Sequence, residues 1–266
     1  MTGHPPYETR AHAGRLTDVR GSEAGAPTTP SLEPVSWRPV AVVVVGTSLL
    51  LSALSLLLPV VVRHQLTRDE GPVQVYVSVL YEHNLPTWWS VCLLAWGAVL
   101  HATVALLTRA RGLPGASAWW STAALLAVLS LDDLSELHER TEPLVRSVVD
   151  PGGFPYAWVF VGVPAALLML TVALVAARRM PPRAARRLVA GLALLFGAAI
   201  GIEILGGLVL SGEGTGPLFA VLVHVEELGE NVGAILAGSA AVAAARWERS
   251  ARGLHVTPLV RERPAR

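Results

Sequence analysis

The sequence predicts an all-α integral membrane protein, a six-helix bundle with both termini in the cytoplasm and with disordered N- and C-terminal tails. Three observations carry this prediction. Hydrophobic residues make up 52% of the 266 residues and charged residues 15%, whereas a soluble domain carries roughly 25% charged residues. The hydrophobic residues gather in six long runs, and the arginines gather between alternate runs.

The six apolar runs are the predicted membrane spans. Most of them reach the roughly 20 residues that a helix needs to cross a hydrocarbon layer of about 30 Å. Because the backbone inside a bilayer must satisfy its own hydrogen bonds, these runs are predicted to be helices. The third run is the shortest, and it spans comfortably only if its helix continues through Asp132–Glu139. The runs are approximately Pro39–Val62, Pro86–Leu107, Ala116–Leu134, Phe154–Ala177, Arg187–Leu210 and Pro217–Ala245.

The arginines orient the predicted spans. All 21 basic residues are arginine, and the positive-inside rule places the larger share of them in the cytoplasm. With the N-terminus inside, 17 arginines fall on the inner side and four on the outer side: Arg63, Arg68, Arg140 and Arg146. Most tryptophans lie near the ends of the runs, where an aromatic belt is expected. The sequence therefore predicts a multi-pass protein of the plasma membrane.

The segments outside the runs divide the chain into a membrane domain and two tails. Residues 1–36 are polar, rich in Gly, Pro, Ser and Thr, and without periodicity, so they are predicted to be a disordered cytoplasmic tail. Residues 37–246 form the predicted six-span domain, and residues 247–266 a basic cytoplasmic tail, either solvated or touching anionic lipid. In the longest outer loop, Arg63–Leu85, the stretch Val73–Tyr81 permits an interfacial helix or a short strand.

Composition excludes several classes of function. A net charge of +1 gives no general field for nucleic acid, so no nucleic-acid partner is predicted. The single cysteine excludes an intramolecular disulfide and a cysteine-based zinc site. The absence of lysine excludes Schiff-base chemistry, a P-loop lysine and a Ser–Lys catalytic pair.

Ionisable residues within the apolar runs are the main functional signal. A charge at the centre of a membrane helix costs roughly 2.5–3.5 kcal/mol on insertion scales, so such residues persist where they pair or act. Four separate segments place acids at nearly the same depth, in the outer half of the predicted bundle, and we predict that they meet in one pocket that opens to the outer side. The residues are Glu82 and Asn84 before the second span, Asp132, Asp133, Glu136, His138 and Glu139 at the end of the third, Glu203 in the fifth, and His224, Glu226, Glu227, Glu230 and Asn231 in the sixth.

Carboxylates this close together need a positive counter-charge. In a low dielectric they must share protons, pair with cations or bind a metal ion. No arginine lies inside the spans at that depth, although Arg63 and Arg140 are near enough in sequence to reach the pocket from its rim. Protons or a metal ion therefore remain as the natural partners.

The leading hypothesis is a divalent metal site in a membrane enzyme that acts on a lipid or small molecule. Glu203 or Asp132 would orient a water molecule or act as general base. Iron, manganese and zinc all suit mixed carboxylate and imidazole ligands, and the spacing does not choose among them. The predicted ligands are Glu139, Glu227, Glu230 and one of His138 or His224.

Two alternatives use the same residues. The carboxylates would serve as a relay in a proton- or cation-coupled transporter, although the inner halves of the spans offer few polar groups and no inverted repeat is visible. A structural or pH-sensing protein would use the two histidines. On a regular helix His138 points away from its acidic neighbours, and a break in the helix before Pro143 would let it face inward.

Three stretches, YEHNLPTWWS, LDDLSELHE and VEELGENVGA, resemble motifs of a group of uncharacterised bacterial polytopic membrane proteins. The motifs of that group are Glu-x-Asn-(Ile/Leu)-Pro-Thr, Leu-Asp-Glu followed by His-Glu, and Glu-Glu-x-x-Glu. The likeness covers roughly Glu82 to Ala234, and Asp133 stands where the group has glutamate. The resemblance adds no reaction, but it implies that the matching positions share one site: Glu82, Asn84, Asp132, His138, Glu139, Glu226, Glu227 and Glu230.

Overall fold

The protein is mostly helical (73%) in a computed structural model that describes residues 32–68 and 70–261. Four helical segments are long and apolar enough to cross a membrane, which confirms the predicted membrane character. They coincide with the first, second, fourth and fifth apolar runs. These segments are α1 (Arg38–Val61), α3 (Leu85–Ala110), α6 (Val159–Ala177) and the continuous stretch Pro182–Glu213.

Two further long helices coincide with the third and sixth runs, which carry most of the acids. They are α4 (Ala116–Ser135), with 20 residues, and α9 (Pro217–Ala243), with 27 residues. Of the two structures that Val73–Tyr81 permitted, the helix is correct, because α2 (Pro72–Val77) occupies most of it. The remaining short helices are η1 (Gln65–Thr67), η2 (Glu139–Thr141) and α5 (Glu142–Val148).

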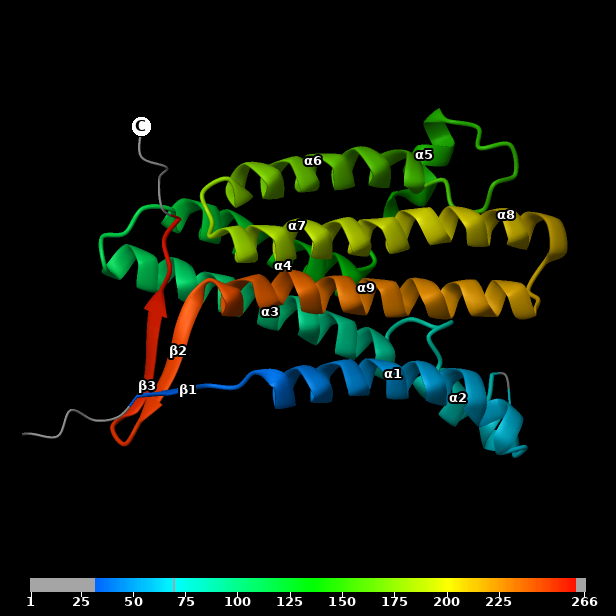
Figure 1. The fold of residues 1–266 in the computed structure, drawn as a ribbon. Coiled ribbons are helices and arrows are strands. Elements are labelled where there is room, and N and C mark those ends of the chain that lie inside the picture. Colours follow the sequence, from blue (N-terminus) through cyan, green and yellow to red (C-terminus); the bar gives the residue numbers. More distant parts are fainter. Residues whose placement is uncertain (1–31, 69, 262–266) are drawn as a thin grey trace, which may run out of the picture. The chain divides into compact units, whose positions relative to one another are not determined.

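Helix α9 is the element around which the others pack. It runs beside α7 (Pro182–Phe196) and α8 (Glu203–Glu213) in the opposite chain direction, and α3 and α1 also lie against it (Figure 1). Helices α3 and α4 form a second close pair, and α6 packs on α4 and α7. Segments that are distant in sequence are thereby brought together around α9.

Glycines let α7 and α9 approach almost backbone to backbone. A Cβ atom added at Gly191 would lie 2.7 Å from the carbonyl oxygen of Gly233, and one added at Gly233 would lie 2.7 Å from the amide nitrogen of Leu195. Neither position has room for a side chain. Small residues at such crossings replace side-chain contacts with close backbone contact, which is the common means of helix association in membranes.

The stretch between Phe196 and α8 is a π-helix, η3 (Gly197–Ile202), rather than a continuous α-helix. A π-helical segment carries one additional residue per turn of hydrogen bonding, and such segments occur frequently at functional sites. Here it immediately precedes Glu203, the predicted acid of the fifth run.

Helix α4 ends earlier than a span through Glu139 requires, so the expected continuation through Asp132–Glu139 is wrong. The helix stops at Ser135 because Glu136 adopts a left-handed conformation (φ +50°). The carboxylate of Asp132 then accepts a hydrogen bond from the backbone N–H of His138 at 3.0 Å, which replaces helical bonding with a local alternative. The break before Pro143, which His138 needs in order to face inward, is confirmed.

The C-terminal tail is not wholly disordered, and this part of the prediction is wrong. Strands β2 (Ala245–Ser250) and β3 (Gly253–Pro258) form an antiparallel hairpin, and β1 (Glu33–Pro34) pairs with β2. Beside the sheet, the Trp247 ring packs edge-on against Trp37, with ring centroids 5.1 Å apart. The rest of the predicted tails, residues 1–31 and 262–266, lie outside the described residues.

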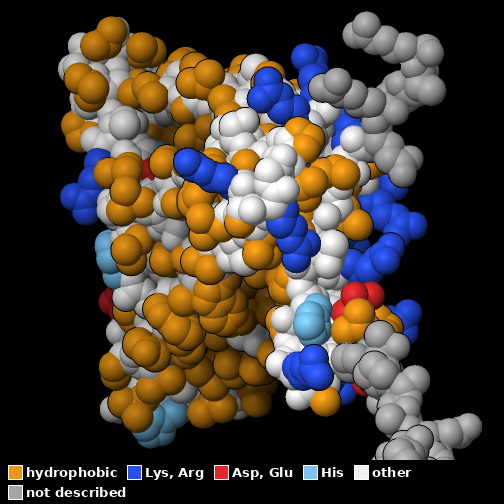
Figure 2. Space-filling model, turned by 90° about the vertical axis from the view of Figure 1, so that its left-hand side faces the viewer, with side chains coloured by type: hydrophobic (Ala, Val, Ile, Leu, Met, Phe, Trp, Pro, Cys, Tyr) orange, Lys and Arg blue, Asp and Glu red, His pale blue; other side chains and the backbone are white. Residues whose placement is uncertain are grey.

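The strands lie at the end of the bundle where α9 finishes and α1 begins (Figure 1). Figure 2 looks at this end and shows arginine side chains gathered there, with few acidic side chains among them. The Arg111 guanidinium donates a hydrogen bond to the carbonyl oxygen of Val256 at 2.7 Å. The sheet is thereby tied to the neighbouring helix end.

The α7–α9 contact yields a stability prediction. Gly191→Ala should lower the free energy of unfolding by about 1–3 kcal/mol, because the new methyl group overpacks a crossing without free space. Gly46→Ala on α1 is the matched control, since nothing lies within 4 Å of its added Cβ; it should be neutral or stabilising by up to about 1 kcal/mol. Denaturant unfolding of both variants in detergent measures the difference. Equal stability of the two would contradict the close crossing.

Candidate functional site

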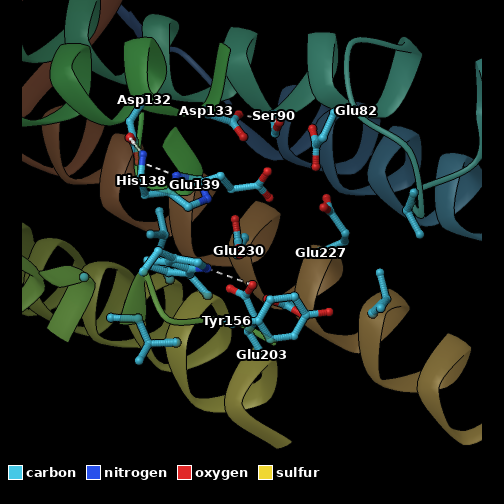
Figure 3. A pocket seen from close by; sticks show the side chains of 18 of the residues that line it. Glu82, Ser90, Asp132, Asp133, His138, Glu139, Tyr156, Glu203, Glu227 and Glu230 are labelled. Atoms are coloured by element: carbon cyan, nitrogen blue, oxygen red, sulfur yellow. Dashed lines mark hydrogen bonds and ion pairs between the residues drawn. The ribbon is translucent and has the colours of Figure 1, made fainter. Parts of the chain in front are cut away.

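One cavity of about 990 Å³ collects most of the predicted site residues. Its walls come from α3, α4, α6, α9, the Pro182–Glu213 segment and the loops beside them. Figure 3 shows the carboxylates from opposite walls directed toward one another. The predicted residues that line this cavity are Glu82, Asp132, Asp133, His138, Glu139, Glu203, Glu226, Glu227, Glu230 and Asn231.

Hydrogen bonds from α3 hold two of these acids. The hydroxyl of Ser90 donates to Asp133 Oδ2 at 2.6 Å, and the hydroxyl of Thr87 donates to Glu82 Oε2 at 3.0 Å. Asn84 does not line the cavity. It caps α3 by accepting from the Thr87 N–H, while its amide donates to the carbonyl oxygens of the preceding loop, at 2.6 Å for Ser78. Asn84 therefore positions Glu82, and the expectation that it lines the pocket is wrong.

The break at the end of α4 brings His138 into the site. Its Nδ1 lies 3.0 Å from Asp132 Oδ2, and its ring stacks at a tilt on Trp158 with centroids 4.6 Å apart. The indole Nε1 of Trp158 donates to Glu203 Oε1 at 3.0 Å. One connected chain of polar groups therefore joins α4 to α8 across the cavity (Figure 3).

Helix α9 contributes the acids that have the fewest partners. Glu226, Glu227 and Glu230 lie within about one turn on the face that lines the cavity. Within the described residues, no hydrogen bond or ion pair from a protein side chain engages these three carboxylates. Asn231 Oδ1 and, from α2, Gln74 Oε1 are buried oxygens of lining side chains that also lack a donor there. The cavity thus offers more acceptors than donors.

The cavity carries a large excess of negative charge. Among the described residues that line it, His138 is the sole basic side chain, and no arginine is present. The two arginines that were near enough in sequence to reach the rim do not line the cavity: Arg63 donates to Val60 O, and Arg140 donates to Ser135 O. The lining carboxylates are Glu70, Glu82, Asp132, Asp133, Glu139, Glu203, Glu226, Glu227 and Glu230.

Groups at the mouth of the cavity respond to this charge. Burial raises the pKa of Glu82 above its usual value; Thr87 opposes this, and the charges of Glu139 and Glu136 raise it further. Burial likewise raises the pKa of Tyr156 to about 12, with nearby carboxylates adding to the effect.

His138 shows the balance between burial and charge. Burial lowers its pKa, but the hydrogen bond with Asp132 and the charges of Asp132, Glu139 and Glu203 outweigh that effect and leave the pKa above its usual value. The imidazolium form is therefore favoured beside these carboxylates.

Two other predicted residues lie outside the cavity. His224 turns toward α1, where its Nε2 lies 2.9 Å from the hydroxyl of Ser55. Glu136 points to the loop before α3 and pairs with His83 Nδ1 at 3.0 Å. The prediction that His224 and Glu136 lie in the pocket is therefore wrong. The side of α9 that carries His224 packs against α1, and the break after α4 turns Glu136 away from the cavity.

The predicted metal ligands do not form a ready-made coordination site. The part of the chain that the structure describes contains no group of three or more His, Cys, Asp or Glu side chains that could hold a metal ion. The acids line a wide cavity instead of converging on one point. Metal binding therefore stays a prediction.

Several lining residues carried no functional signal in the sequence. Trp158 reads as a membrane-interface tryptophan, yet it binds Glu203 and stacks on His138. Ser90 and Tyr156 also line the cavity, and neither belongs to a recognisable motif. One weak indication was present for Ser90. It lies one turn after Pro86, on the same face of α3 as Thr87, and so on the side that carries the site.

Residues 38–245 match the sequence model of a domain of unknown function, DUF8692. The chain belongs to this family. The match covers every helix of the cavity and ends where β2 begins, so the DUF8692 domain includes the whole site and little of the sheet. No curated protein and no solved structure matches the chain.

The charge at the cavity mouth predicts a pH-dependent stability. Because the folded-state pKa of Glu82 lies above 4.5, its ionisation is harder in the folded than in the unfolded protein. This contribution to stability is intact below pH 4.5 and is lost as pH rises through the folded-state pKa. Glu82→Gln keeps the acceptor for Thr87 and removes the charge, so the variant should match the wild type near pH 4 and melt at a higher temperature at pH 8.

Thermal melts of both proteins in detergent across this range measure the effect. The exposed Glu213→Gln, outside the cavity, is the control and should show no such pH-dependent gap. A Glu82→Gln variant that melts below the wild type at pH 8 would show that burial and the charges of Glu136 and Glu139 do not disfavour the Glu82 carboxylate.

Proposed function

We propose that this DUF8692 protein is a proton- or cation-coupled membrane transporter whose cavity carboxylates exchange protons for a cation. The observation that carries the proposal is the set of nine carboxylates around one cavity without an arginine among the described lining residues. Carboxylates brought together away from water cannot all remain ionised and unpaired. They hold protons when the cavity is empty, and a bound cation releases those protons.

The proposal includes a six-span topology in the plasma membrane with both termini cytoplasmic. At a rise of about 1.5 Å per residue, the 20 residues of α4 and the 27 of α9 extend far enough to cross a hydrocarbon layer of about 30 Å. Their acids face the cavity instead of lipid, which reduces the cost of placing them at membrane depth. The arginines at the end that carries the strands favour the cytoplasm for that end.

The carboxylates are arranged better for an exchangeable cation than for a fixed metal ion. A metal ion needs several ligand atoms around a single point, about 2 Å from it, and the described residues hold no such preformed group. A cavity of about 990 Å³ instead has room for a mobile cation and its water, or for a molecule.

A metal-dependent enzyme acting on a lipid or small molecule is the second candidate, and one observation favours it. Asp132 engages His138 Nδ1, which leaves Nε2 as the available ring nitrogen. Metal-binding histidines are commonly oriented by a carboxylate in this way. In this candidate His138, Glu139 and Glu230 would close around iron, manganese or zinc, with Glu203 as the base.

Proton exchange in proteoliposomes tests the leading proposal. Addition of Na⁺, K⁺, Mg²⁺, Mn²⁺ or Zn²⁺ outside vesicles that contain a pH-sensitive dye should change the internal pH for at least one cation. Glu227→Gln and Glu230→Gln should reduce the initial rate at least tenfold, whereas Glu213→Gln should preserve it. No cation-dependent proton movement in the wild type would rule out coupled exchange of these ions, and a stoichiometric metal that survives purification and is lost from Glu139→Ala would favour the enzyme.

Cysteine labelling tests the topology. In a Cys92→Ser background, Asp150→Cys should react with a membrane-impermeant maleimide added to intact cells, because the proposal places this loop outside. Arg252→Cys in the turn between β2 and β3 should react only after the cells are permeabilised. Both positions are exposed, so access to the reagent alone decides the result. Labelling with the reverse pattern would invert the orientation.

A further inference from the structure

We propose that the cavity takes a lipophilic organic cation, with its charge at the carboxylates and its apolar part against the wall formed by α6 and the π-helical segment. This inference rests on the proposed function and names its substrate class. An inorganic ion would use the acids alone, whereas the structure provides two further recognition elements beside them: a pair of aromatic rings and a large apolar wall.

The aromatic rings lie directly beside Glu203. Trp158 donates its indole N–H to Glu203, and Figure 3 shows the Tyr156 ring next to the same carboxylate. Both rings line the cavity, together with Phe219 from α9. Aromatic faces attract organic cations through their quadrupole, most strongly where water is excluded. A carboxylate flanked by two such rings is suited to a large, weakly hydrated cation.

Two glycines provide the space for these rings. A Cβ atom at Gly207 on α8 would lie 2.8 Å from Cδ2 of the Tyr156 ring, and a Cβ atom at Gly162 on α6 would overlap the Trp158 ring. Both rings therefore lie against helix backbone. Side chains at either position would displace them, so the placement of the rings beside Glu203 is built into the helix packing.

The apolar wall continues from the aromatic rings toward the inner part of the cavity. Small and flexible side chains leave the space open, and none of them offers an oxygen or nitrogen ligand to an inorganic ion. They present the kind of surface that buries the hydrocarbon part of a drug-sized molecule, for which cavities of roughly 300–1,000 Å³ are typical. The wall consists of Val161, Gly162, Ala165, Ala166 and Met169 on α6, and Leu195, Phe196, Ala199 and Ile200 on the Pro182–Glu213 segment.

The apolar side of the cavity reaches the protein surface between α4 and α6. Val128 on α4 and Val161 on α6 line the cavity, yet they are 48% and 46% exposed. Helix α6 is apolar over its length and α4 carries no charged residue before Asp132, so this edge faces lipid in the proposed topology. A lipophilic cation concentrates in a bilayer, and it can enter sideways through this edge without crossing water.

Binding of tetraphenylphosphonium tests the inference. Tetraphenylborate has nearly the same size and shape with the opposite charge, so it is the matched control ligand. The full-length protein in phosphatidylcholine nanodiscs, with empty nanodiscs subtracted, is examined by equilibrium dialysis with each labelled ion. Saturable binding of the phosphonium, at least tenfold tighter than any binding of the borate, is the expected result. Equal binding of both ions, or no saturable phosphonium binding, overturns the inference.

Variants of the wall and of the charge locate the ligand. Ala165→Phe fills the wall and should weaken phosphonium binding at least tenfold, as should Glu203→Gln. Leu168→Phe, on the outward face of α6 and 66% exposed, is the control and should bind as the wild type does. Met169→Phe replaces Ala165→Phe if that variant is not monodisperse. Unchanged binding in the wall variant places the ion elsewhere and overturns the inference.

Combining this assay with proton exchange separates the two proposals. If inorganic cations drive proton exchange through Glu227 but the phosphonium does not bind saturably, the proposed transport function is supported and the proposed substrate class is refuted. Saturable phosphonium binding without any proton movement would establish the substrate class and refute coupled transport. The wall variant should also spare exchange driven by an inorganic ion, because it leaves the acids of α9 unchanged.

Discussion

An excess of negative charge around one cavity is the constraint on which the other features of this molecule depend. Among the described residues that line it, nine carboxylates face one basic side chain, His138, so protons or a cation are their natural partners. The polar contacts that exist hold carboxylates in place without neutralising them: Ser90 on Asp133, Thr87 on Glu82 and Trp158 on Glu203. The site is therefore arranged to keep its charge available to something that comes and goes.

The scaffold reaches this arrangement by combining close and open packing along the same helix. On its inner part α9 lies almost backbone to backbone with α7, at Gly191 and Gly233. Toward its N-terminus, the acids of α9 line a cavity, whose other walls are formed by α4, α6 and α8. A membrane helix can afford buried acids on one stretch because another stretch is fixed by dense contacts. The close crossing and the cavity are therefore neighbours on α9, because Gly233 lies about one turn after Glu230.

The long helices could be predicted from the sequence because hydrocarbon thickness sets both their length and their composition. A break before Pro143 was also suggested by the sequence, but its position at Glu136 could not be predicted, since it depends on the hydrogen bonds of Asp132 with His138. The gathering of acids at one depth was readable, and it predicted ten of the lining residues. The sequence did not show which side of α9 packs against which neighbouring helix. His224 was therefore wrongly assigned to the cavity. The sheet was not predicted, because the sequence does not reveal that residues 33–34 pair with the distant strand β2 or that Trp37 packs against Trp247.

The π-helix before Glu203 has a consequence for how this site can arise and be lost. One additional residue in a helical turn rotates everything beyond it by about 100° relative to an uninterrupted α-helix. The direction in which Glu203 points therefore depends on the register of Gly197–Ile202. Closing this π-turn into a regular α-helix with the sequence unchanged would swing the acid away from the cavity. Removing one residue together with the π-turn would instead return Glu203 to its present direction, so a one-codon deletion within Gly197–Ile202 should preserve the contact with Trp158.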